Sequence, residues 1–261
     1  MRFESPPGAT GTRTPAVPVH AATLRRSVDL FRAFLVEQTD PDRFYRALAA
    51  DSVAQLGRYV SVRDAVVLDV GGGPGFFAAA FENAGARYVR LEPEAHDMAG
   101  GVPDAGAGLG ALRASGMELP VRTGSVDVCY SSNVLEHVPE PARMLDEMVR
   151  VTRPGGTIFV SFTPWWSPWG GHETAPWHYL GGEYARRRYR RRTGREPKNR
   201  VGHSLYPYSV ASALAWARST PDATAVDVLA RYHPSWAQWI VRVPVAREVL
   251  SWNLAMVLRR R

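Results

Sequence analysis

Cysteine is almost absent from this chain of 261 residues, in which Cys129 is the single example. No disulfide can therefore form within the chain, and a metal site built on several cysteines is excluded. So low a cysteine content is typical of proteins that work in a reducing compartment. We expect a cytoplasmic location.

Long apolar runs are also lacking. The most apolar late stretch, residues 236–258, is interrupted by Arg242, Pro244, Arg247 and Glu248. A membrane-spanning helix needs about 20 mostly apolar residues, so this stretch does not qualify. The first residues are rich in proline, glycine and threonine and lack the apolar core of a signal peptide. We expect a disordered leader over residues 1–22.

Acidic residues are outnumbered, but the imbalance is local. The net charge is +7, and nine basic residues and one acidic residue fall between Arg186 and Arg200. The rest of the chain is therefore close to neutral. This distribution argues against a protein that coats nucleic acid over its whole surface.

What is present is the composition of a globular protein, with 45% hydrophobic and 22% charged residues. Two helical stretches come first, at residues 23–38 and from residue 41 onwards, and we expect them to form a helical cap over residues 23–60. Strands and helices then alternate, which is typical of a doubly wound, Rossmann-like α/β sheet. The expected strands cover residues 65–70, 88–92, 110–114, 126–132, 157–162, 225–230 and 253–258.

Residues 164–208 interrupt this alternation after the fifth expected strand. The stretch holds four of the eight tryptophans together with the arginine run. Disordered segments are poor in aromatic residues, so we expect an ordered insertion on the substrate side. Residues 61–163 would then form the ligand-binding core, and residues 209–261 would complete the fold.

The clearest local signal is a glycine-rich loop between a buried strand and a helix, where residues 66–75 read VVLDVGGGPG. Such a loop lets a ligand approach the backbone and offers N–H groups at a helix N-terminus. Gly71, Gly73 and Gly75 give the spacing G-x-G-x-G, whereas dinucleotide-binding proteins have G-x-G-x-x-G. The loop therefore departs from the dinucleotide fingerprint, and a nucleotide-binding fold that binds NAD or no ligand stays the alternative.

This loop, preceded by Asp69, resembles the first motif of class I S-adenosylmethionine-dependent methyltransferases, in particular the type that includes quinone-biosynthesis enzymes. The resemblance covers roughly residues 65–162. It implies that Asp69 and the loop backbone hold the methionine half of the cofactor. It also implies that Glu92, at the end of the second strand, accepts hydrogen bonds from both ribose hydroxyls.

Further motifs extend the resemblance. Residues 115–120 read SGMELP and are similar to the family's third motif, with Ser115 where an aspartate is usual. Residues 131–138 and 153–156 resemble the turn after the fourth strand and the turn before the fifth. The cofactor residues that the resemblance implies are Asp69, Gly71, Gly73, Gly75, Glu92, Ser115, Gly116, Met117 and Asn133.

The implied reaction is methyl transfer from S-adenosylmethionine, which leaves S-adenosylhomocysteine. Residues 131–134 lack the Asn/Asp-Pro-Pro-aromatic motif of nucleic-acid amino-methylating enzymes, and Cys129, inside an expected strand, is not placed as a cytosine nucleophile. We expect a small-molecule or lipidic acceptor, methylated on oxygen or carbon. The alternatives are an RNA methyltransferase, or a protein that binds the cofactor or a membrane without turnover.

Candidate catalytic residues follow the fifth strand, where ligands of α/β sheets bind. His172 or His178 could act as a base for a hydroxyl acceptor, with Glu173 orienting an imidazole. The alternative is that these histidines only hold the loop together. Their spacing differs from the zinc-protease pattern, so we predict no metal. His137 is expected to support the turn after the fourth strand.

The tryptophans and arginines of the insertion leave more than one interpretation open. The tryptophans could form its core or an aromatic wall for a flat or lipidic acceptor. The run from Arg186 to Arg192 could be a solvated helix face, an RNA-binding patch, or a contact with an anionic membrane surface, to which Arg259 and Arg261 would add.

Overall fold

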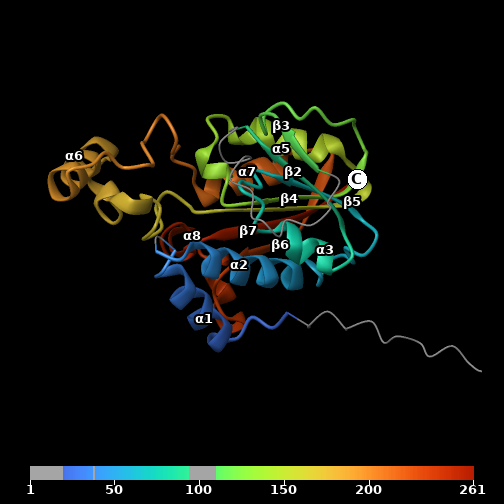
Figure 1. Ribbon diagram of the computed structural model, residues 1–261, viewed down its shortest axis with the longest axis horizontal. Helices are drawn as coiled ribbons and strands as arrows, with labels where there is room; N and C mark the ends of the chain where they lie inside the picture. The colour runs from blue at the N-terminus through green and yellow to red at the C-terminus, as the bar shows by residue number, and fades with distance from the viewer. Residues whose placement is uncertain (1–19, 38, 94–109) are drawn as a thin grey trace, which may run out of the picture.

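The computed structural model describes residues 20–37, 39–93 and 110–261. Most of the expected leader, residues 1–19, lies outside these ranges. A seven-stranded sheet in the order β3-β2-β1-β4-β5-β7-β6 forms the middle of the molecule (Figure 1). The strands are β1 (Val66–Val70), β2 (Arg87–Glu92), β3 (Gly110–Arg113), β4 (Val126–Ser132), β5 (Thr152–Phe162), β6 (Ala223–Ala230) and β7 (Leu254–Arg260).

The sheet confirms the expected doubly wound α/β fold. Strands β1 to β5 are parallel, whereas β7 runs antiparallel to both of its neighbours. The strand order reverses beside β1, where Asp69 is in register with Arg90 of β2 on one side and Tyr130 of β4 on the other. Ligands of open α/β sheets bind beyond the carboxyl ends of the strands at such a point. We call the edge where β1, β2, β4 and β5 end the carboxyl-end edge.

Helices cover both faces of the sheet (Figure 1). On one face lie α2 (Pro41–Leu56) and α3 (Ala78–Asn83), with α1 (Leu24–Phe34) packed on α2. On the other lie α5 (Pro141–Val151) and α7 (Val210–Ser219). Polar caps start several of them; the side chain of Asp40, for example, accepts a hydrogen bond from the Arg43 N–H.

Each face has its own apolar core. Met144, Leu145 and Met148 of α5 are fully buried against one face. Against the other face α2 contributes an apolar stripe of four buried side chains, Phe44, Leu48, Val53 and Leu56. The second helix of the expected cap is therefore part of a core of the main fold.

Two excursions leave the carboxyl-end edge, at the left of Figure 1. The first is the insertion after β5, with η2 (His172–Thr174), η3 (Trp177–Leu180) and α6 (Gly182–Thr193). The second joins β6 to β7 through η4 (Ser235–Arg242) and α8 (Pro244–Leu250). None of the described helices is both long and apolar enough to cross a membrane.

The reversed direction of β7 corrects one expectation about the arginines. Arg259 is in register with Thr157 in the middle of β5 and donates from Nη1 to the Gly155 carbonyl, and the Arg261 N–H donates to the Asp222 carbonyl just before β6. Arg259 and Arg261 therefore lie at the edge opposite the carboxyl-end edge. They cannot extend the basic surface of α6.

Candidate functional site

The glycine loop between β1 and α3 is held in a conformation that requires glycine. Gly71 has φ +80°, and a Cβ added there would lie 2.4 Å from a methyl group of Val134. Gly73 has φ +51°, and a Cβ there would meet nothing within 4 Å. Gly71 therefore packs closely against the turn after β4. Gly73 exposes backbone without a side chain to open space.

Side chains from the end of β2 fasten this loop. The Gly73 N–H donates to Oε2 of Glu92 at 3.0 Å, and Nη1 of Arg90 donates to the Gly73 carbonyl at 2.9 Å. Glu92 is buried, with 8% of its surface exposed. A carboxylate therefore lies directly beside the open part of the loop, which is suited to a ligand with hydroxyl or ammonium groups.

Asp69 lies beneath the loop and is almost fully buried. Its Oδ2 accepts a 2.5 Å hydrogen bond from the Tyr88 hydroxyl, and a Cβ added at Gly72 would lie 3.1 Å from the same oxygen. Burial, with a smaller contribution from the charge of Glu92, raises the pKa of Asp69 to about 7, although the Tyr88 hydrogen bond opposes the shift. Asp69 thus titrates near neutral pH.

The turn after β3 reaches the same edge. The Met117 N–H donates to Ser115 Oγ at 3.2 Å, and a Cβ added at Gly116 would lie 3.0 Å from a methyl group of Val70, the last residue of β1. After β4, the side chain of Asn133 accepts a 2.6 Å hydrogen bond from Asn253 Nδ2. The expected cofactor residues therefore come from the ends of four neighbouring strands.

A second group, beside the insertion, brings together Glu136, His137 and His172. One potential ligand atom from each lies within 4.8 Å of the others. Nδ1 of His137 lies 2.6 Å from the Ser204 carbonyl and therefore donates, which leaves Nε2 as an acceptor. Within the described part of the chain, His172 Nε2 and Glu136 Oε2 are buried without a hydrogen-bond partner.

Burial decides the charge of His172 in this group. It lowers the pKa of His172 to about 3, with smaller contributions from His137 and His178, so the imidazole is neutral at physiological pH. Burial also raises the pKa of Glu136. Two imidazoles and a carboxylate can relay a proton, and they are also a ligand set for a divalent transition metal. The absence of a metal therefore stays a prediction.

The other two candidate catalytic residues have partners within the insertion. His178 is buried, its Nε2 lies 3.0 Å from the Trp165 carbonyl, and its ring packs against those of Trp165 and Tyr179. Glu173 accepts hydrogen bonds from the backbone and side-chain nitrogens of Asn199, at 2.6 and 2.8 Å. The carboxylate of Glu173 thus holds Asn199 rather than an imidazole.

Two tyrosines that the sequence did not single out lie between the loop and the histidines. The ring of Tyr45, on α2, stacks on Phe76 with 4.7 Å between centroids. Burial mainly raises the pKa of Tyr45, followed by Glu37, which accepts a 2.8 Å hydrogen bond from the Tyr45 hydroxyl; Tyr232 and Glu136 make smaller contributions. Tyr232 is partly buried, and its hydroxyl accepts a 3.4 Å hydrogen bond from Asn133. These side chains come from distant parts of the chain, so no local pattern could have joined them.

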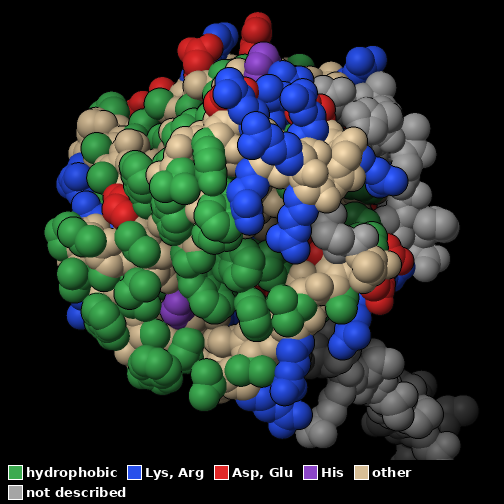
Figure 2. All heavy atoms as spheres, turned by 90° about the vertical axis from the view of Figure 1, so that its left-hand side faces the viewer, with side chains coloured by type: hydrophobic (Ala, Val, Ile, Leu, Met, Phe, Trp, Pro, Cys, Tyr) green, Lys and Arg blue, Asp and Glu red, His purple; other side chains and the backbone are tan. Residues whose placement is uncertain are grey.

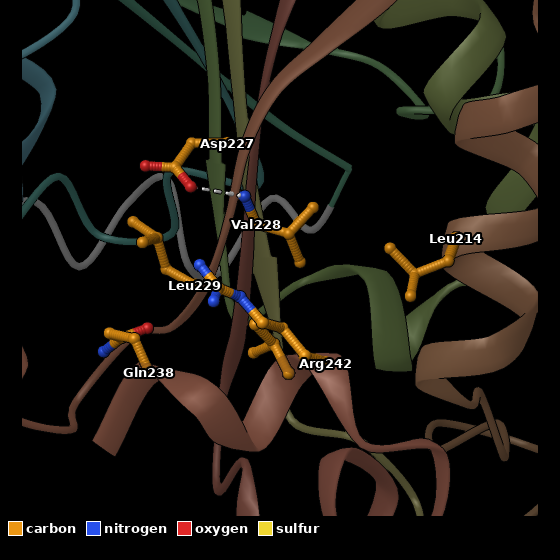
Figure 3. Close-up of a pocket in the computed structure, with 7 residues that line it drawn as sticks. Leu214, Asp227, Val228, Leu229, Gln238 and Arg242 are labelled. Atoms are coloured by element: carbon orange, nitrogen blue, oxygen red, sulfur yellow. Dashed lines mark hydrogen bonds between the residues drawn. The ribbon is translucent and has the colours of Figure 1, made fainter. Parts of the chain in front are cut away.

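A separate hollow of about 300 Å³ lies between β6, η4 and α7 (Figure 3). Arg242 and Gln238 approach it from η4, and Leu214 from α7. The Asp227 carboxylate accepts a 2.9 Å hydrogen bond from the N–H of the next residue, Val228. The lining includes none of the expected cofactor or catalytic residues, so we do not assign the reaction to it.

Sequence comparison finds relatives over almost the whole chain. A family model described as a methyltransferase domain matches residues 68–160. An uncharacterized methyltransferase of Mycobacteroides abscessus is 51% identical over 92% of this chain and 96% of its own length. One from Mycobacterium leprae is 51% identical, covering 92% of this chain and 91% of its own length.

Structure comparison finds the same fold in solved structures. An S-adenosylmethionine-dependent methyltransferase from Mesorhizobium loti superposes with a TM-score of 0.56 and 19% identity, over 81% of this chain and 98% of its own. A putative enzyme of the same kind from Listeria monocytogenes gives 0.55 and 12%, over 79% of this chain and 96% of its own. At this identity the likeness concerns the fold.

Proposed function

Because this chain belongs to the S-adenosylmethionine-dependent methyltransferases, we propose that it methylates a small-molecule or lipidic acceptor on oxygen or carbon. One observation carries the proposal most directly. The bare backbone of Gly73 lies in open space with the buried Glu92 carboxylate bonded beside it, at the point where the strand order reverses. This arrangement suits a ligand that carries hydroxyl groups and a positive charge.

The residues at the carboxyl-end edge fit this cofactor. Glu92 would accept hydrogen bonds from the ribose hydroxyls, and the loop around Gly71 and Gly73 would leave room for the methionine half. The turn from Ser115 to Met117, packed on Val70, would border the adenine. The bound cofactor supplies an electrophilic methyl group on a sulfonium and leaves as S-adenosylhomocysteine.

The chain's own part in the reaction would be positioning, which is worth most in a direct transfer. Tyr45, Phe76 and Tyr232 would enclose the acceptor beside the glycine loop and exclude water. For a hydroxyl acceptor, the neutral His172 is the candidate base, because its Nε2 is buried and unpartnered in the described part of the chain. Glu173 and His178 would position the segment that carries it.

The arginine run supports an anionic partner on the cytoplasmic side. Arg186 is already bonded to Glu183 and Glu196, and Arg188 lies over the Trp177 ring at 3.9 Å. Arg187 and Arg190 also pair with Glu183 and Glu196, and the helix α6 that carries the run from Arg186 to Arg192 projects from the carboxyl-end side of the molecule (Figure 1). We propose that it faces the anionic groups of the membrane inner face or of the acceptor.

The test is calorimetric titration with S-adenosylmethionine and S-adenosylhomocysteine. Both should bind, and Glu92→Gln should weaken binding by about 1.5–3 kcal/mol, the value of hydrogen bonds to a charged acceptor. Glu118→Gln is the matched control, because that carboxylate is exposed on the same side of the fold. Unchanged affinity in Glu92→Gln, or binding of NAD instead, would contradict the assignment. Cofactor binding without any S-adenosylhomocysteine production from cell extracts would indicate a binding protein.

A further inference from the structure

The connection from β6 to β7 carries apolar side chains to the carboxyl-end edge. Because β7 is antiparallel to β5, its first residue Leu254 pairs with Phe162, the last residue of β5, and with Ala230, the last residue of β6. The segments η4 and α8 therefore lie where the parallel strands end. Their exposed apolar side chains are Trp236, Trp239, Val243, Val245, Val249 and Leu250.

The exposure of these side chains is more than the fold explains. Trp236 is 70% exposed and Val245 is 76% exposed, and α8 buries none of its residues. Isolated apolar side chains are common on surfaces, but a helix whose valines and leucine all face solvent contributes little to the protein's own core. Such a surface is typical of an interaction site.

The insertion after β5 adds aromatic side chains to the same side. Trp166, Trp177, Tyr179 and Leu180 are all exposed. Figure 2, which faces the carboxyl-end side, shows hydrophobic side chains gathered over much of the surface. We call this surface, formed by the exposed apolar side chains of η4, α8 and the insertion, the apolar face.

Basic side chains border the apolar face, and acidic ones are sparse on it (Figure 2). The side chains of Arg187 and Arg190, on α6, are 62% and 57% exposed, and they pair with Glu183 and Glu196. Exposed tryptophan and valine side chains with arginines beside them are typical of proteins that lie on an anionic bilayer, where indole rings occupy the headgroup region.

We propose that the apolar face docks onto the surface of an anionic phospholipid bilayer, with η4 and α8 entering the headgroup region. The contact is peripheral, since no described helix could span a bilayer. This inference rests on the proposed function. In the docked molecule, the carboxyl-end edge, which carries the methyl-transfer site, faces the lipid. The acceptor is then a molecule taken directly from the bilayer.

The test is co-sedimentation with vesicles of phosphatidylglycerol and phosphatidylcholine. Trp236→Asp combined with Val245→Asp should reduce binding at least about tenfold, the change expected from the loss of one buried apolar side chain. Val226→Asp is the matched control, because Val226 is 50% exposed in the middle of β6, away from the apolar face. It should bind as the parent does.

A second readout reports insertion itself. Lipids brominated on their acyl chains should quench the tryptophan fluorescence of the parent, and Trp236→Phe should remove part of that quenching. Equal binding by the double variant and the parent would overturn the proposal, as would no vesicle binding by the parent. So would a concentration-dependent dimer that Val245→Asp abolishes, because the apolar face would then join two copies.

The two proposals fail separately. Calorimetric titration with S-adenosylmethionine should give the same affinity for the double variant, Val226→Asp and the parent. Vesicle binding without cofactor binding would contradict the proposed function and leave the docking intact. Cofactor binding without vesicle binding would contradict the docking and leave the proposed function intact.

Discussion

At the scale of one residue, Asp69 shows how burial changes the pKa of a carboxyl group. Within the described residues, its carboxylate is held by the Tyr88 hydroxyl and is bonded to no arginine or lysine. Burial therefore dominates and raises its pKa to about 7. The folded protein holds a proton here that the unfolded chain releases near the ordinary aspartate pKa of 3.8.

This difference makes one prediction about stability and pH. Because the folded pKa is the higher one, the stability that protonated Asp69 supports is present at low pH and is lost as pH rises towards 7. Asp69→Asn should therefore gain stability relative to the parent between pH 5 and pH 8, by roughly 2–3 kcal/mol. Urea denaturation at both pH values measures the change.

Asp29→Asn serves as the control for that experiment, because Asp29 is exposed on α1. Its difference from the parent should be the same at both pH values. A pH-independent difference for Asp69→Asn as well would mean that Asp69 is not the proton-binding group.

At the scale of elements, Glu173 contacts the far part of the insertion. Its two oxygens accept hydrogen bonds from Asn199, after α6, so one side chain closes the segment on itself. Glu173→Ala should leave the sheet intact and loosen residues 164–208, with a several-fold faster cleavage by trypsin within the arginine run. Cofactor affinity should stay unchanged.

Glu183→Ala is the matched control for the insertion. Glu183 bonds Arg186 and Arg187 on the surface of α6, where exposed ion pairs add little stability. Its cleavage rate should stay near that of the parent. Equal rates for Glu173→Ala and the parent would show that the hydrogen bonds to Asn199 are not needed.

At the scale of elements, the strand bounds also show which features a local sequence pattern predicts. The strand at 126–132 and the strand ends that carry Asp69 and Glu92 agree with expectation, because buried β-branched runs and a glycine turn are local signals. β5 begins at Thr152, five residues earlier than expected at 157, because Thr152 still pairs with Val126 across an irregular register. The proline and glycines there had indicated a turn.

The rest of the site depends on tertiary contacts. Tyr45 and Tyr232 come from α2 and from the end of β6, and His172 reaches His137 only through the course of the insertion. No spacing in the sequence brings these side chains together. The glycine loop could be predicted, whereas the acceptor side could not.

At the scale of the whole molecule, Arg231 ties separate elements together. Its guanidinium is buried and donates to Ser132 on β4, Ser161 on β5 and Ser52 on α2, at 2.5–2.7 Å. Its own carbonyl accepts from Arg26 of α1. One side chain thus joins the sheet to the helices that pack over it.

Replacing Arg231 should therefore weaken the whole fold. Arg231→Ala leaves two buried serine hydroxyls and a partly buried one without this donor and opens a cavity, and should cost more than about 3 kcal/mol in urea denaturation. Arg187→Ala, on the exposed face of α6, should change stability by less than about 0.5 kcal/mol. Equal losses for the two variants would contradict the role given to Arg231.

The reversal of β7 has a practical consequence for handling the protein. Arg261 lies at the edge opposite the apolar face, because β7 runs back across the sheet from Leu254. A sensor chip that captures the molecule through a tag fused after Arg261 would hold every copy with the apolar face outward. Vesicles flowed over such a chip would meet one uniform orientation, whereas coupling through surface amines would present a mixture.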